Sequence, residues 1–137
     1  MAFFGLFGGK NKGYTSPWLQ LTVVYATAPA GLDPDDAFAL RGRIMAAGPI
    51  GFEFLNSDSF VAFFPGTTGG HEAGNRLAET LRGMARDKSV AAFGVGVQQG
   101  ECLAQIGGSG RFVAKPVGTV ISQAMNLAID EAGSKRQ

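Results

Sequence analysis

The chain has 137 residues, of which 45% are hydrophobic, and its 12 basic and 11 acidic residues give a formal net charge of +1. This length suits one compact domain with a single core, and the balanced charge argues against a nucleic-acid partner. Cys102 is the only cysteine and His71 the only histidine, which excludes an internal disulfide and a zinc site built from these ligands. A lone thiol fits a reducing compartment, so we expect the protein in the cytoplasm.

Residues 1–17 are predicted to lie outside the folded domain. Their first part is apolar and contains Phe3, Phe4 and Phe7. The run is too short to span a bilayer and no basic region precedes it, so we expect neither a membrane anchor nor a signal peptide. This segment is either a loosely ordered terminus, as chain ends commonly are, or a weak contact for a membrane or a partner.

The first half of the chain predicts a strand, a helix and a hairpin. Residues 18–28 are β-branched and aromatic with a continuous apolar centre, which is typical of a central strand covered on both faces. A helix is predicted over 33–48, with an aspartate as N-cap and proline at the first helical position. The apolar runs at 50–55 and 59–64 flank the turn residues 56–58 and predict a β-hairpin.

The second half predicts two more helices and three more strands. Apolar residues at helical spacing predict a helix over 70–87 and another over 119–132, which Gly133 would end as its C-cap. Short strands are predicted at 90–97, 101–106 and 111–115.

The order of these elements is β-α-β-β-α-β-β-β-α. It predicts an α+β domain of the ferredoxin-like, or palm, type over residues 18–133, followed by a tail at 134–137. The sheet is expected to be mostly antiparallel, with helices on one face. Aromatic residues occur on both faces of the predicted hairpin, so we expect helices to cover one face and a second subunit to cover the other. These aromatic residues are Phe52, Phe54, Phe60, Phe63 and Phe64.

The segment 94–101, followed by Ile106-Gly107 and Val117-Gly118, resembles the second half of class III adenylate and guanylate cyclase catalytic domains. By pattern, the resemblance covers about residues 20–130. It implies a palm fold and assembly as a head-to-tail dimer.

In that family two carboxylates hold two divalent metal ions, which neutralise the nucleophile and the leaving phosphates. The resemblance implies that Asp58 in the hairpin is one of these carboxylates. At the position of the other, after the first strand, this chain has Thr27. The metal pair is therefore incomplete, and Mg²⁺ or Mn²⁺ is expected only if a nucleotide is bound.

The other positions of the family's site also differ. Adenylate cyclases have lysine before the hairpin aspartate, where this chain has Phe54 and Leu55, and aspartate before a glycine turn, where it has Lys115. The family's asparagine and arginine on the last helix match Ser122 and Asn126. Losing the arginine removes the charge that stabilises the transition state, so the resemblance implies neither purine selection nor catalysis.

The hairpin resembles diguanylate cyclase palm domains more weakly. Their Gly-Gly-Asp-Glu-Phe signature corresponds to residues 56–60, Asn-Ser-Asp-Ser-Phe, which lack both glycines and the metal-binding glutamate. The predicted hairpin at 101–115 favours the comparison with class III cyclases.

Each single residue that could have a catalytic or binding role could instead have a purely structural one. We favour the interpretation that Asp58 is a turn residue whose side chain bonds the local backbone. The other interpretation is that Asp58 is a remnant metal ligand. Arg111 and Lys115 could contact a phosphate, although basic residues at strand ends are commonly solvated. His71 is expected to be exposed in the first turn of a helix, and Cys102 to be packed in the core.

The favoured function is a catalytically degenerate cyclase-homology domain that acts as a dimerising regulatory or scaffold module, with weak nucleotide binding as an option. Its partner would be a second copy or a related domain. The first alternative is an active, divergent nucleotide cyclase that takes carboxylates from Asp33, Asp35 or Asp36. The second alternative is a ferredoxin-like protein-binding module unrelated to nucleotides.

Overall fold

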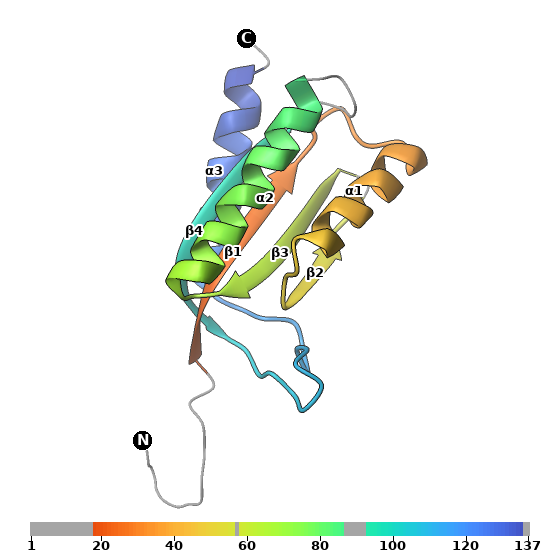
Figure 1. Cartoon of the computed structure of the whole chain (residues 1–137). Coiled ribbons are helices and arrows are strands. Elements are labelled where there is room, and N and C mark those ends of the chain that lie inside the picture. The colour runs from red at the N-terminus through yellow and green to blue at the C-terminus, as the bar shows by residue number, and fades with distance from the viewer. Residues whose placement is uncertain (1–17, 57, 87–92, 136–137) are drawn as a thin grey trace, which may run out of the picture.

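A four-stranded antiparallel sheet with helices on both faces forms the protein in the computed structural model (Figure 1). The structure describes residues 18–56, 58–86 and 93–135. The phenylalanine-rich segment 1–17 and the first residues of the strand predicted at 90–97 lie outside this described part. The elements in chain order are β1 (Trp18–Thr27), α1 (Pro34–Ala46), β2 (Gly51–Phe54), β3 (Ser59–Pro65), α2 (Thr68–Arg86), β4 (Gly94–Leu103) and α3 (Thr119–Lys135).

The sheet has the order β2-β3-β1-β4, so β1 is an inner strand, as its continuous apolar sequence predicts. All ten of its residues pair with β4, and residues 21–27 pair with β3 on the other side. At one end of the strand, Thr27 lies opposite Ser59 of β3 and Gly94 of β4. Six consecutive residues of β1 are buried, which places the strand in the middle of the core.

The start of α1 follows the sequence prediction. The carboxylate of Asp33 accepts a hydrogen bond of 2.8 Å from the backbone N–H of Asp36, and Pro34 occupies the first helical position. Asp35 and Asp36 in the first turn and Arg43 in the last turn complement the helix dipole. The chain turns away at Gly48, whose φ of 72° suits glycine.

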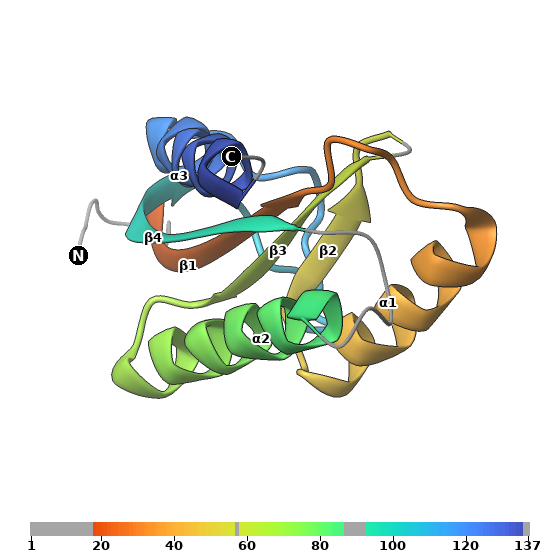
Figure 2. The same cartoon turned by 90° about the horizontal axis from the view of Figure 1, so that it is seen from above.

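The helices cover both faces of the sheet (Figure 2). As predicted, two helices, α1 and α2, share one face of the antiparallel sheet. The last helix, α3, lies on the opposite face. The core under α1 and α2 comprises Val24, Ala26, Ala28, Leu40, Ile44, Phe60, Ala62, Phe64, Leu77, Ala78, Leu81, Phe93 and Val95. The core under α3 comprises Leu21, Val23, Tyr25, Val61, Phe63, Cys102, Ala104, Val120, Ala124 and Ala128.

Several boundaries in the second half differ from the prediction. The residues at 98–100, predicted to separate two strands, continue β4, because β1 is long enough to pair along all ten residues of that strand. The strand predicted at 111–115 is absent from the described structure, where single bridges join Ile106 to Phe112 and Leu103 to Val117 instead. Gly133 lies within α3, which continues to Lys135.

The hairpin aromatic residues are mostly covered within the chain. The rings of Phe60 and Phe64 are buried under the helices, and Phe52 packs against the same core. On the opposite face Phe63 is only 5% exposed, and its ring meets that of Phe112 edge to face at a centroid distance of 5.5 Å. This face therefore needs no second subunit to cover it, contrary to the prediction. None of the described helices is long and apolar enough to cross a membrane.

Candidate functional site

The neighbouring ends of β1 and β3 bring together the two positions that the cyclase resemblance singled out. Thr27 pairs with Ser59, and Asp58 immediately precedes Ser59. The Ser59 hydroxyl donates to Oδ1 of Asp58 at 2.9 Å and is hydrogen-bonded to the Thr27 hydroxyl at 3.2 Å. We call Thr27, Asp58 and Ser59 the strand-end cluster.

The backbone holds this cluster in place. The carbonyl of Asp58 accepts a bond of 2.7 Å from the N–H of Ala28, which ties the hairpin turn to the end of β1. The N–H of Asp58 donates to Oδ1 of Asn56 at 3.0 Å, so the side chain that bonds the turn backbone is that of Asn56. The Asp58 carboxylate is left to bond the Ser59 hydroxyl.

The strand-end cluster contains one carboxylate, whereas two-metal chemistry needs carboxylates for both ions. Within the described residues, no group of three or more histidine, cysteine, aspartate or glutamate side chains could hold a metal ion. The carboxylate of Asp33 caps α1, and Asp35 and Asp36 follow in the first turn of that helix. The residues present therefore do not fit a two-metal centre, and we derive no reaction step through one.

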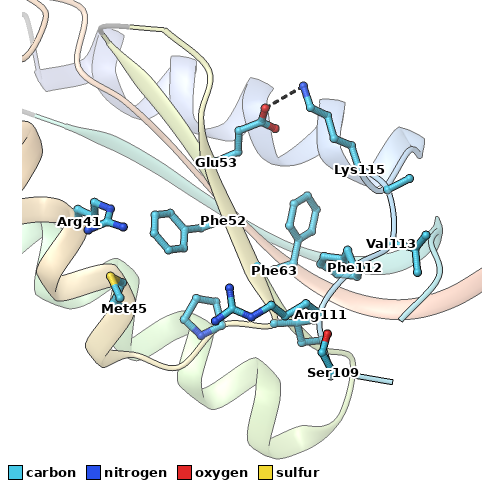
Figure 3. A pocket seen from close by; sticks show the side chains of 15 residues that line it. Arg41, Met45, Phe52, Glu53, Phe63, Ser109, Arg111, Phe112, Val113 and Lys115 are labelled. Atoms are coloured by element: carbon cyan, nitrogen blue, oxygen red, sulfur yellow. Dashed lines mark ion pairs between the residues drawn. The ribbon is translucent and has the colours of Figure 1, made fainter. Parts of the chain in front are cut away.

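A groove of about 860 Å³ lies along the edge strand β2, between α1 and the segment that follows β4 (Figure 3). We call it the edge groove. Its apolar lining includes Phe52 of β2 and Met45 of α1, and the Phe63–Phe112 ring pair lies beside them. Gly51 makes room for the pair, because a Cβ at this position would lie 2.9 Å from the ring of Phe112.

The polar groups of the edge groove are mainly basic. Lys115 forms an ion pair of 2.8 Å with Glu53, but its side chain is 77% exposed, so this pair contributes little to stability. The side chains of Arg41 and Arg111 also line the groove. Neither guanidinium forms an ion pair with another described residue. The structure thus brings Arg111 and Lys115 to one groove, as candidates for a phosphate contact.

Glu53 is a groove residue that the sequence analysis missed. The ring of Phe54 packs into the core under α1, 5.6 Å from the ring of Phe60, so it points away from Lys115. The side chain that meets Lys115 belongs to the preceding residue, because successive residues of a strand point to opposite faces. This alternation in the sequence Phe52-Glu53-Phe54 was the available signal.

The two candidate residues on the last helix are not part of these sites. Ser122 and Asn126 are exposed on α3, which packs on the sheet through Ala124 and Ala128. Among the described residues, no hydrogen bond joins either side chain to the strand-end cluster, and neither lines the edge groove.

The only histidine and the only cysteine lie elsewhere. His71 is half-buried in α2, where its Nδ1 has no hydrogen-bond partner within the described residues, so the prediction of an exposed histidine was wrong. Cys102 is fully buried between β4 and α3, as predicted, and burial raises the pKa of its thiol. A protonated, buried thiol packs like a small apolar side chain.

The palm-type sheet identifies the protein's fold as that of nucleotide cyclase catalytic domains. No family model matches the chain, and no curated protein matches it significantly. Among solved structures, a bacterial light-regulated adenylyl cyclase is similar with a TM-score of 0.56 and 16% identity; the match covers 87% of this chain but 41% of that one.

Two further structures extend this similarity. The adenylyl cyclase CyaB from P. aeruginosa matches with a TM-score of 0.52 and 16% identity over 80% of this chain and 71% of that one. The non-canonical dimeric guanylyl cyclase domain of the RhoGC fusion protein from the aquatic fungus Blastocladiella emersonii matches with a TM-score of 0.53 and 12% identity, over 82% of this chain and 74% of that one. At these identities the comparison concerns the fold alone.

Proposed function

We propose that the protein is a cyclase-homology domain that does not cyclise nucleotides and acts as a dimerising regulatory or scaffold module in signalling. One observation carries this proposal: the hydroxyl of Thr27, rather than a second carboxylate, lies beside Asp58 and Ser59. Two-metal catalysis needs carboxylates that hold both ions, and a neutral hydroxyl is a poor substitute. The exposed, uncharged Ser122 and Asn126 on α3 provide no cation for a transition state.

Weak nucleotide binding is compatible with this role. The edge groove has aromatic and apolar walls, which suit a planar ring, and the basic side chains of Arg111 and Lys115, which suit a phosphate. Mg²⁺ or Mn²⁺ would then arrive with the nucleotide, because the residues of the strand-end cluster do not form a two-metal site.

The dimeric state rests on the fold similarity. The RhoGC guanylyl cyclase domain forms a non-canonical dimer, so a domain of this fold can pair, and this supports a dimer here. The partner would be a second copy or a related domain. The buried, reduced Cys102 supports a cytoplasmic location.

The test measures turnover and binding together. Purified full-length protein is incubated with ATP or GTP and Mn²⁺, and cyclic nucleotide is quantified, while thermal unfolding is followed with the same ligands. We expect no product, and a nucleotide that binds the folded state should raise the unfolding temperature without needing Mn²⁺. Cyclic product that disappears in Asp58→Ala would instead establish the divergent-enzyme alternative and refute the proposal.

A further inference from the structure

The exposed side of α1 carries apolar side chains that continue outward from the edge groove, which Met45 also lines. Phe38 is 76% exposed, more than any other large apolar side chain of the described residues, and Met45 is 52% exposed. Between them lies Gly42, where a Cβ would have no atom within 4 Å. These residues lie on one side of the helix because they are separated by four and three positions. The inward side is formed by the fully buried Leu40 and Ile44.

Opposite charges flank this surface on the same helix. Asp35 precedes Phe38 by three residues and Arg41 follows it by three. Both side chains belong to exposed residues, and neither has an ion-pair partner in the described part of the chain. We call Asp35, Phe38, Arg41, Gly42 and Met45 the α1 stripe.

We propose that the α1 stripe is the contact surface for a second copy of this chain, with the two α1 helices packed antiparallel about a two-fold axis near Phe38. This inference rests on the dimerisation proposed above and assigns the surface that makes it. A two-fold contact uses the same patch on both copies, so the patch must complement itself.

The charges of the stripe meet this condition. In an antiparallel pair centred on residue 38, position 35 of one helix lies opposite position 41 of the other. Asp35 of each copy therefore meets Arg41 of the other copy, and two symmetric ion pairs form. Within one helix the same two residues are six positions apart, about 9 Å along the axis, and do not form an ion pair.

The shapes of the stripe are complementary as well. A helical side chain leans toward the N-terminus of its own helix, which in an antiparallel pair is toward the C-terminal half of the partner helix. The ring of Phe38 would thus lie over Gly42 of the other copy, where the missing side chain leaves space. One helix on each side buries less than the roughly 800 Å² per partner of a standard interface, so we expect a weak dimer that dissociates on dilution.

The first test removes the apolar centre. The full chain is studied by sedimentation equilibrium over a wide concentration range, with Phe38→Asp compared to Ile129→Asp. Ile129 is a matched control, since it is 51% exposed on α3. We expect Phe38→Asp to raise the dimer dissociation constant at least about tenfold and Ile129→Asp to leave it unchanged. Both sites are exposed, and circular dichroism verifies that the variants fold.

The second test exchanges the charges. Asp35→Arg and Arg41→Asp should each weaken the dimer by about three- to tenfold, because like charges then meet across the interface. The double variant restores opposite charges and should return the dissociation constant to within about twofold of the wild type.

The outcomes separate this inference from the function on which it rests. A wild-type dimer that persists in Phe38→Asp, or a double variant as weak as the single ones, would overturn the α1 stripe as the interface while leaving dimerisation intact. A wild type that is monomeric at every concentration would overturn the proposed dimerisation itself, and this inference with it.

Discussion

Thr27 is the residue on which the proposed loss of catalysis depends most directly. It lies at the end of β1, where its hydroxyl and the Asp58 carboxylate both bond Ser59. A carboxylate at this position would face Asp58 across a single hydroxyl. The difference between a metal-binding pair and a hydrogen-bonded turn thus comes down to one side chain.

Placing a carboxylate at position 27 is expected to create a metal-binding pair. In Thr27→Asp the two carboxylates repel each other without metal, which should lower the free energy of unfolding by about 1 kcal/mol. Millimolar Mn²⁺ should reverse this loss and raise the unfolding temperature, because the ion binds only the folded pair. Thermal unfolding with Mn²⁺ and with EDTA measures both effects.

Two comparisons control this measurement. Adding Asp58→Asn to Thr27→Asp leaves one carboxylate and should abolish the Mn²⁺ effect. The wild type should show no such effect; if Mn²⁺ stabilised the wild type as strongly as the variant, the native cluster would be a competent metal site and the argument from Thr27 would fail.

At the scale of elements, the contact between β4 and α3 depends on small residues. Glycine occupies positions 94 and 96 of the strand, and alanine occupies the facing helix positions 124, 128 and 132. A Cβ at Gly96 would collide with the carbonyl oxygen of Ala124, and one at Gly94 with that of Ala128. These glycines therefore serve helix–sheet packing, where only a residue without Cβ allows this approach.

Gly96→Ala should destabilise the protein strongly for this reason. The collision involves helix backbone, which cannot rotate away as a side chain could, so we expect a loss of about 2–4 kcal/mol in the free energy of unfolding. Gly133→Ala is the matched control within α3, because its Cβ would meet no atom within 4 Å. Urea denaturation compares the two; equal losses would show that helix packing against Gly96 is not the cause.

Features that depend on neighbouring residues were predicted from the sequence more accurately than features that depend on pairing between distant segments. The cap of α1 was predictable because Asp33 bonds a backbone group three residues away. The continuation of β4 through 98–100 was not, since it depends on β1, which lies far away in the sequence. An apolar helix side likewise does not specify which face of a sheet it covers, so α3 could not be assigned to a face.

In the candidate site, too, one part could be predicted from the sequence and another part could not. The proximity of Thr27 and Asp58 was implied by the family resemblance and agrees with the pairing of β1 and β3. The edge groove depends on where the segment after β4 passes β2, and this brings Phe112 against Phe63 and Lys115 against Glu53. No local pattern in the sequence specifies that path.

At the scale of the whole molecule, one sheet separates two cores, and a polar clamp joins the helices across the edge of β4. Arg82 of α2 donates two hydrogen bonds to Oε1 of Glu131 of α3, at 3.1 and 2.8 Å. Glu131 accepts the N–H of Val95 at 3.0 Å, while Arg82 donates to the Val95 carbonyl at 3.2 Å. The hydrogen bond to Glu131 raises the pKa of Arg82, so the clamp stays charged.

Such a clamp couples the two faces, because neither α2 nor α3 can leave the sheet without breaking it. Cys102 reports on one face only, since it is buried in the core under α3. Burial raises its pKa, so the unfolded chain releases the thiol proton at a lower pH than the folded chain does. Stability should therefore fall as the pH rises from the ordinary thiol pKa toward the raised one, and labelling experiments need a fixed pH.

A substitution in the core under α1 and α2 is thus expected to expose Cys102 on the opposite face. Leu81 is fully buried in α2, and Leu81→Ala should cost about 2–5 kcal/mol. If the two faces open together, a thiol reagent should label Cys102 at least about thirtyfold faster in this variant, because labelling follows the population of the open state. Leu81→Val should give a smaller acceleration in the same direction if the alanine variant folds poorly. Exposed Ile129→Ala on α3 should give none, and an unchanged labelling rate in the Leu81 variants would mean that the two cores open independently despite the clamp.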